Sequence, residues 1–195
     1  MTGGVRPSSE DIDHQILDIT GGLLARRGIR DTSVQAVADE TGYSKSGLLR
    51  RFPSKEELVL AAFEQAAETT RNVIGTVAAL PYGRQRDAAA LTALAELLFS
   101  RPGYAHLLTA AVTSSPGDGL HEHVEPMVRA LYAMFTPEQE LRIDLERATH
   151  ITAVIGAVSV VSLTHQRGLT ADEAVRLVLE TTWNALGHTG RLPRS

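Results

Sequence analysis

The chain has 195 residues, of which 43% are hydrophobic and 22% charged, and its formal net charge is −4. This composition is typical of a globular protein, and the lack of cysteine excludes disulfides, thiolate metal sites and a cysteine nucleophile. The N-terminus shows no secretory signal, and the longest weakly polar run, residues 151–163, is too short to span a bilayer. We therefore expect a cytoplasmic protein with no membrane partner.

The first predicted helix covers residues 8–28. Ser8 or Ser9 is its expected cap and Gly28 its expected end. Its apolar residues recur at helical spacing and share one face: Ile12, Ile16, Ile19 and Leu23. Gly21 and Gly22 interrupt this pattern, so either a neighbour packs closely there or the helix is locally weak.

Two short helices with a glycine between them follow. The first, residues 32–41, opens with a capping box of Thr32 and Gln35. Gly42 then stands where a left-handed cap is needed, and the next helix runs from Ser44 to about Arg51. The small residue Ala38, the glycine turn and Leu48 have the spacing of a helix-turn-helix.

The second of these short helices has two distinct sides. At about 100° per residue, Leu48 and Phe52 point toward the core, and Ser46 and Arg50 point outward. A short helix with small residues and an outward arginine suits the DNA major groove, because arginine pairs bidentately with guanine. An ordinary solvated helix bearing positive charges is the alternative interpretation.

Positive charge is concentrated around this helix. Lys45 and Lys55 are the only lysines in the chain, and Arg50 and Arg51 lie between them. Residues 1–58 carry eight positive and nine negative side chains, so this segment as a whole is not basic. The local cluster lies where a DNA backbone would run.

The segment from Ile16 to Leu58 resembles the N-terminal DNA-binding domain of the TetR family of transcriptional repressors. The resemblance rests on "RRGIRDTSV", "VADETGYSKSGLLRRF" and "SKEEL". It implies a homodimer that binds a palindromic double-stranded DNA operator and leaves it when a small-molecule inducer enters the C-terminal domain. The family usually has a threonine at Gly47 and a phosphate-contacting tyrosine at Leu49, so Arg50 and Arg51 are candidates for the missing phosphate contacts. The expected DNA-contacting residues are Thr32, Ser33, Tyr43, Ser44, Lys45, Ser46, Gly47, Leu49, Arg50, Arg51 and Lys55.

The remaining residues, 59–195, predict a larger helical domain after the DNA-binding domain of residues 1–58. Capping boxes begin the helix that leads into this domain and two helices within it: Ser54 with Glu57, Thr136 with Gln139, and Thr170 with Glu173. The expected helices cover 54–80, 87–100, 104–115, 121–135, 136–168 and 170–187. No alternating strand pattern is present, so the fold class is all-α with about nine helices.

The last two predicted helices are the expected dimer interface. The first has small residues that allow close helix approach: Ala148, Ala153, Gly156, Ala157 and Ser159. The second carries one apolar stripe: Val175, Val178, Leu179, Thr182 and Leu186. In the family these helices form a four-helix bundle with their symmetry mates, although an intramolecular core would produce the same patterns.

Candidate ligand-binding residues are the large apolar residues of the C-terminal domain, although plain core residues have the same spacing: Phe63, Phe99, Tyr104, Leu108, Met127, Leu131 and Met134. A second hypothesis is a metal-dependent hydrolase that uses His121, His123 and His150. A third is a helical small-molecule carrier that does not bind DNA. No phosphate-binding loop, nucleophile elbow or HExxH motif occurs, so no enzyme activity and no cofactor are expected.

Overall fold

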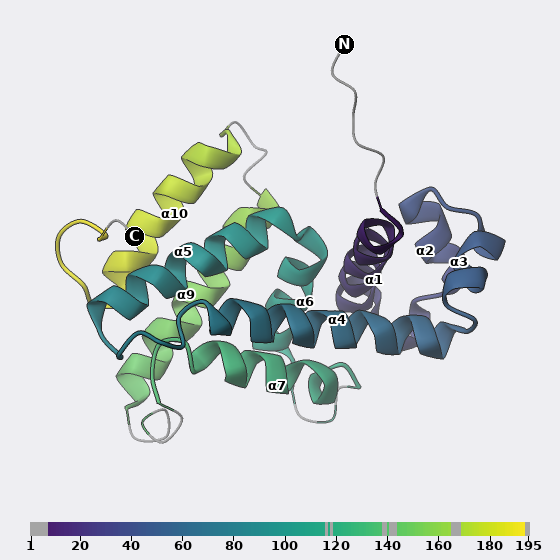
Figure 1. Ribbon diagram of the computed structural model, residues 1–195. Helices are drawn as coiled ribbons and strands as arrows, with labels where there is room; N and C mark the ends of the chain where they lie inside the picture. The colour runs from purple at the N-terminus through teal and green to yellow at the C-terminus, as the bar shows by residue number, and fades with distance from the viewer. Residues whose placement is uncertain are drawn as a thin grey trace, which may run out of the picture.

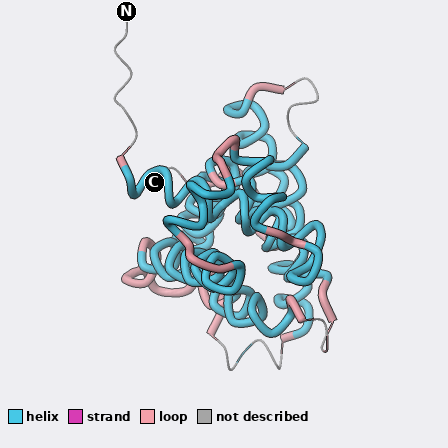
Figure 2. The backbone as a smooth tube through the Cα atoms, turned by 90° about the vertical axis from the view of Figure 1, so that its right-hand side faces the viewer, coloured by secondary structure: helices cyan, strands magenta, loops and turns pink. Residues whose placement is uncertain are grey.

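The computed structural model describes residues 8–115, 117, 119–137, 140, 144–164 and 169–193. These residues form helices and loops, and none of them lies in a strand (Figure 2). The helices are α1 (Ser9–Asp31), α2 (Val34–Thr41), α3 (Lys45–Arg51), α4 (Lys55–Gly75), α5 (Arg84–Ser100), α6 (Pro102–Thr113), α7 (His121–Tyr132), α9 (Leu145–Thr164) and α10 (Ala171–Ala185). The expected all-α fold is confirmed.

Figure 1 shows α1, α2 and α3 gathered at one end of the molecule, with α4 running from that end into the larger helical body. Two buried apolar clusters match this arrangement. The smaller one joins α1, α2 and α3 to the start of α4: Ile16, Leu23, Val34, Val37, Ala38, Leu48 and Leu58. From Ala62 onward, α4 contributes to the larger cluster, together with α5, α6, α7, α9 and α10. Helix α4 therefore connects the two parts as one continuous element.

Local sequence signals set the helix ends in the small part. Ser8 caps α1 in a capping box with Asp11, and Gly28 breaks the helical path with φ 77° before one more turn ends at Asp31. Gly42 ends α2 in the left-handed conformation and its N–H bonds Ala38 O, as expected. One expected cap is wrong: Ser33 caps α2, and Thr32 instead closes α1 by donating to Gly28 O.

Several boundaries in the larger part differ from expectation. Helix α4 ends at Gly75 rather than near Leu80, and the chain continues in short i to i+3 turns. Helix α9 begins at Leu145 rather than at Thr136, and the expected capping partner Gln139 lies outside the described residues. Thr170 and Glu173 do form the expected capping box of α10.

Helix α9 is long and apolar enough, by length and composition alone, to cross a membrane. The apolar run 151–163 is too short, but the helix extends beyond it on both sides. Helix α9 packs against α5, α6 and α10, and Ile151, Val154, Ile155 and Val158 are completely buried in the core. This packing accounts for the buried side of the helix, whereas Val160 on the same helix is 49% exposed.

Candidate nucleic-acid interface and cavity

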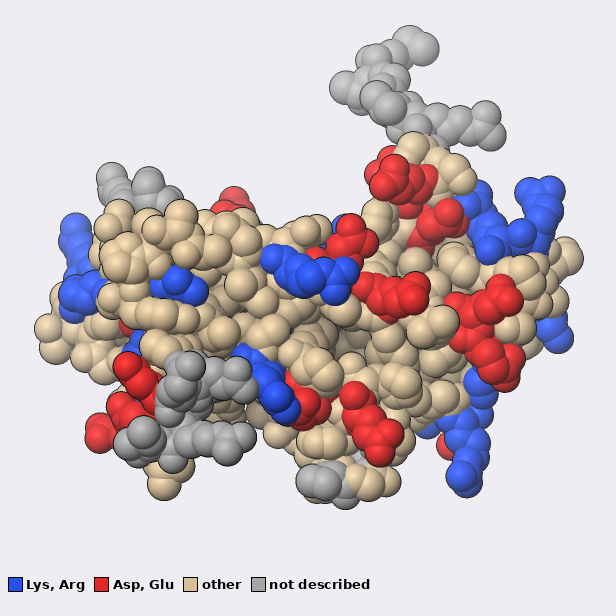
Figure 3. Space-filling view, turned by 60° about the horizontal axis from the view of Figure 1, so that its bottom comes forward, with Lys and Arg blue, Asp and Glu red and all other residues tan. Residues whose placement is uncertain are grey.

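Helix α3 presents the two sides that its sequence predicts. Leu48 is 0% exposed and packs in the small core, whereas Lys45, Ser46 and Arg50 are exposed. Ser44 caps α3 by accepting from Gly47 N at 3.1 Å, which fixes where the helix starts. Figure 3 shows Lys and Arg side chains projecting from the end of the molecule that α2 and α3 form.

The other expected DNA-contacting residues differ in accessibility. Ser33, Tyr43 and Ser44 are exposed, with Tyr43 at 37%. Gly47 is half-buried, and Leu49 packs partly against the small core. Thr32 is only 2% exposed, and its hydroxyl donates to Gly28 O. The Thr32 side chain therefore does not reach the surface, so the structure does not support its predicted contact with DNA.

Two of the expected phosphate-binding side chains have partners within the protein. Arg51 forms an ion pair with Asp13 and donates to Ser9 Oγ at 3.1 Å, so it ties α3 to α1. Lys55 Nζ donates to Arg30 O at 2.8 Å. A lysine ammonium has three N–H donors, so this bond leaves two of them for a phosphate. Arg50 remains the exposed arginine of α3.

Helices α1 and α6 meet at glycines. A Cβ on Gly21 would lie 2.7 Å from Leu107 Cδ1, and a Cβ on Gly22 would lie 3.2 Å from Gly103 Cα. The close approach of α6 therefore accounts for both glycines in α1. Of the two alternatives that the sequence left open, the structure shows the close packing of a neighbour.

Asp18 supplies the cap that α6 lacks in its own sequence. Helix α6 begins at Pro102 and has no local side-chain cap. Asp18 Oδ2 accepts from Gly103 N at 2.9 Å, and Asp18 Oδ1 accepts from Tyr104 N at 3.0 Å. A carboxylate is favourable at a helix N-terminus because free N–H groups point toward it. Burial nevertheless raises the pKa of the Asp18 carboxyl, and the two N–H donors offset this only in part.

A hydrogen bond continues from α6 to α4. Thr70 Oγ1 donates to Ala66 O at 2.8 Å, so the contact of 2.6 Å between Tyr104 Oη and Thr70 Oγ1 has the tyrosine as its donor. Burial raises the pKa of the Tyr104 hydroxyl, which keeps it protonated. A connected path therefore runs from Thr70 through Tyr104 to Asp18 in α1.

A cavity of about 160 Å³ lies between α4 and α7. Phe63 and Met127, two of the predicted ligand-binding residues, line it. Sequence reasoning named His123 only as a metal ligand and missed the remaining lining residues, among them Ala66, Ala67, Thr70 and Arg71 of α4. Alanines at helical spacing carry no signal that distinguishes a cavity wall from an ordinary helix contact.

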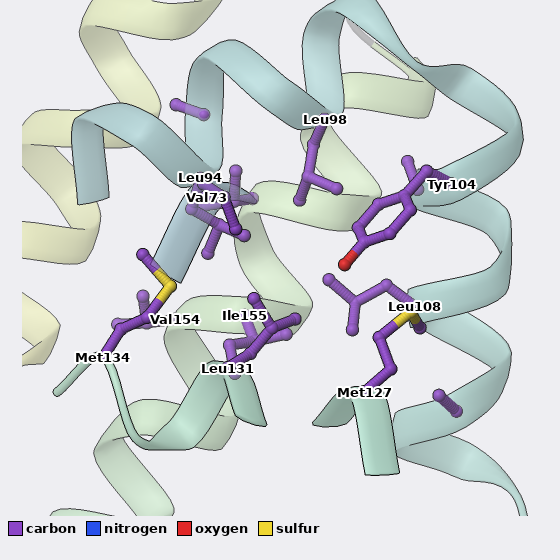
Figure 4. Packing of buried hydrophobic residues seen from close by; sticks show 14 of the residues in the cluster. Val73, Leu94, Leu98, Tyr104, Leu108, Met127, Leu131, Met134, Val154 and Ile155 are labelled. Atoms are coloured by element: carbon purple, nitrogen blue, oxygen red, sulfur yellow. The ribbon is translucent and has the colours of Figure 1, made fainter. Parts of the chain in front are cut away.

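The remaining predicted ligand-binding residues lie in or beside the core. Leu108, Leu131 and Met134 are completely buried, and Tyr104 is 3% exposed. Figure 4 shows these four side chains pointing into one packed cluster with Met127. Phe99 is half-buried and packs against the same cluster.

The three histidines of the hydrolase hypothesis do not form one site. His121 Nδ1 pairs with Ser114 Oγ at 2.9 Å, and His123 stacks on Phe63 with ring centroids 4.4 Å apart. His150 lies on α9. Across the described part of the chain, no three His, Asp or Glu side chains are grouped to hold a metal ion. The hydrolase hypothesis therefore lacks its expected site.

Comparisons with known proteins agree with this geometry. Residues 16–62 match the family described as "Bacterial regulatory proteins, tetR family". None of the curated proteins matches the chain. Among solved structures, FadR from Bacillus subtilis in complex with stearoyl-CoA is 16% identical, with 86% of this chain and 96% of that chain covered and a TM-score of 0.56.

Two further solved structures have the same fold. A TetR-like transcriptional regulator from Rhodococcus sp. RHA1 is 18% identical over 94% of this chain and 100% of its own, with a TM-score of 0.53. AmtR from Mycobacterium smegmatis is 15% identical over 98% of this chain and 91% of its own, with a TM-score of 0.54. Residues 16–62 thus match the tetR-family model, and the chain has the fold of TetR-like transcriptional regulators.

Proposed function

We propose that this protein is a cytoplasmic, ligand-responsive repressor that binds a palindromic operator as a homodimer. Residues 1–58 form the DNA-binding domain, and residues 59–195 bind the inducer and form the dimer. The observation that carries the proposal is the exposure pattern of α3, in which Leu48 is buried while Lys45, Ser46 and Arg50 are exposed. Such a helix is able to enter the major groove with its polar side toward the bases.

In this proposal Arg50 reads bases, and Ser33, Tyr43, Ser44, Lys45 and Lys55 contact phosphates. Ser46 and Gly47 let the helix seat deeply, and Leu49 is near enough to the surface to touch a thymine methyl group. Arg51 serves mainly to hold α3 on α1 through Asp13.

The proposed dimer interface is the outer side of α9 and α10. On α9, Ala153 is exposed, Gly156 and Ala157 are half-buried, and Val160 is 49% exposed. A Cβ on Gly156 would meet no atom within 4 Å, so this side of α9 is open to a second helix. On α10, Leu177 is 41% exposed, whereas Val178, Thr182 and Leu186 of the expected stripe are buried within the chain.

The cavity between α4 and α7 is the proposed inducer site. Thr70 lines the cavity and is connected to Asp18 by hydrogen bonds through Tyr104. A ligand that displaces α4 therefore also disturbs the contact between α1 and α6. Release of DNA requires the inducer to bind the two states with different affinity. FadR was solved with stearoyl-CoA, but a cavity of about 160 Å³ is too small for an acyl chain of that length.

Fluorescence anisotropy with labelled duplexes tests the proposal. The purified protein should bind a palindromic duplex from its own upstream region with two chains per duplex, and bind a scrambled duplex on the order of a thousandfold more weakly. Equal affinity for both duplexes would mean that the protein binds DNA without sequence specificity. Binding to neither duplex would favour the hypothesis of a small-molecule carrier.

A further inference from the structure

The cavity between α4 and α7 has a size that limits its occupant. Figure 1 shows the two helices side by side, and they are in contact. The space of about 160 Å³ exists because α4 presents Ala66 and Ala67 there and α7 presents Ala130. An apolar cavity of roughly 150 Å³ in another protein binds benzene. The occupant should therefore have an apolar part about the size of one ring.

The two ends of the cavity differ in chemistry. At one end, Phe63 and His123 stack with an interplanar angle of 7°. Arg71 follows Phe63 by eight residues on α4, which is about 12 Å along a helix axis. Apolar side chains, Val124 and Met127, line the wall that α7 forms between these ends.

The charge at the cavity favours an anion. Arg71 is the one Arg or Lys among the described lining residues, and no Asp or Glu is among them. Arg71 is exposed, and it is in none of the ion pairs found within the described residues. The hydroxyl of Thr70 is already satisfied by Ala66 O and Tyr104. A planar guanidinium binds a carboxylate through two parallel N–H donors.

We propose that this cavity binds a small aromatic monocarboxylate, with its ring between α4 and α7 and its carboxylate on Arg71. The proposal names the effector class of the regulator proposed above and rests on that function for its regulatory meaning. Binding to the free protein does not depend on DNA, so the two are tested separately.

Isothermal titration with benzoate and with its neutral analogue benzamide tests the ligand class on the full chain. The wild type should bind benzoate about three- to fivefold more tightly than benzamide, because Arg71 is exposed and water screens the ion pair. Arg71→Gln should remove this difference by weakening benzoate alone. Arg27→Gln, which removes an exposed arginine of α1 outside the cavity, should leave both affinities unchanged.

A second variant tests the location of the ring. Ala67→Leu adds volume at a half-buried position of the cavity wall and should weaken both ligands at least tenfold. The thermal unfolding of Ala67→Leu is compared with that of the wild type. If Ala67→Leu does not fold, the benzoate and benzamide affinities of Arg71→Gln decide whether the ligand binds in this cavity. Binding of neither ligand to the wild type, or equal binding of both, would overturn the proposal.

Operator titrations separate this proposal from the proposed function. If the protein binds its operator but not benzoate, the proposed regulatory function stands and the proposed ligand class is wrong. If the protein binds benzoate through Arg71 but binds no DNA, the proposed ligand class stands and the proposed regulatory function is wrong.

Discussion

Asp18 of α1 accepts a hydrogen bond from the backbone N–H of Gly103, the second residue of α6, at 2.9 Å. The same pair of residues sets how closely the two helices approach, because a Cβ on Gly103 would lie 1.7 Å from Asp18 O. Helix α6 thus receives its cap from a residue 85 positions away in the sequence. This contact joins the end of the molecule that contains α1, α2 and α3 to its larger helical body.

Gly103→Ala should force α6 away from α1 and break both bonds to Asp18. We expect a loss of at least about 2 kcal/mol in the free energy of unfolding, as for overpacked core sites, measured by urea denaturation. Gly75→Ala is the matched control, because a Cβ on Gly75 would meet no atom within 4 Å. It should be neutral or stabilise by up to about 1 kcal/mol. Equal effects of the two substitutions would contradict the close approach of α1 and α6.

His106 should make stability depend on pH at the same contact. Burial and, secondarily, the charge of Arg26 lower the pKa of His106 below its usual 6.5, while Asp18 opposes this shift. The unfolded chain therefore binds the proton more tightly than the folded protein. The stability that neutral His106 contributes is complete above pH 6.5 and is lost as the pH falls below that value.

His106→Gln should accordingly flatten the decline of the unfolding free energy between pH 7 and pH 5. Urea denaturation across this range measures the slope for the variant and the wild type. A wild-type stability that rises on acidification through this range, with the rise lost in the variant, would mean that the pKa shift has the opposite sign.

Arg51 and Arg50 are neighbours with different expected roles in stability. Arg51→Gln removes the ion pair with Asp13 and the bond to Ser9, and should lower the free energy of unfolding by up to about 1 kcal/mol. Arg50→Gln changes an exposed side chain and should stay within about 0.5 kcal/mol of the wild type. Thermal unfolding of both variants measures this, and a larger effect for Arg50 would mean that it holds α3 in place.

Local signals explain which parts of the fold were predictable from the sequence. The turn at Gly42 and the cap at Ser44 act within four residues, and the structure has both as expected. The cap of α2 was off by one residue because Thr32 and Ser33 are adjacent and both suit a cap. Gln35, the other half of the predicted box, bonds Asp39 instead.

Non-local contacts explain what could not be predicted. The sequence shows Gly21 and Gly22 as an anomaly, but only the fold reveals Gly103 and Leu107 against them. Similarly, Leu108 and Met127 are both buried in the core, yet of these two only Met127 also lines the cavity. Spacing identifies the buried side of a helix and does not show where packing leaves space.

The dimer interface is tested by changing the open side of α9. Replacing Gly156 and Ala157 together with glutamate should give monomers, because like charges would meet across a two-fold axis. Asn72→Glu, at an exposed position of α4, is the control variant and should remain dimeric. Sedimentation velocity measures the mass of each, and an undisturbed dimer in the double variant would place the interface elsewhere.

The most direct test of the central claim is the affinity of Arg50→Ala for operator and for scrambled DNA, beside that of Lys45→Ala. Lys45 is the better phosphate-contact control because it is exposed, whereas Lys55 also donates to Arg30 O. We expect Arg50→Ala to cost about 1–3 kcal/mol on the operator and much less on scrambled DNA. Lys45→Ala should weaken both by similar factors and make the salt dependence shallower by about one per half-site. If Arg50→Ala loses affinity equally on both duplexes, Arg50 is a phosphate contact and α3 does not read bases through it.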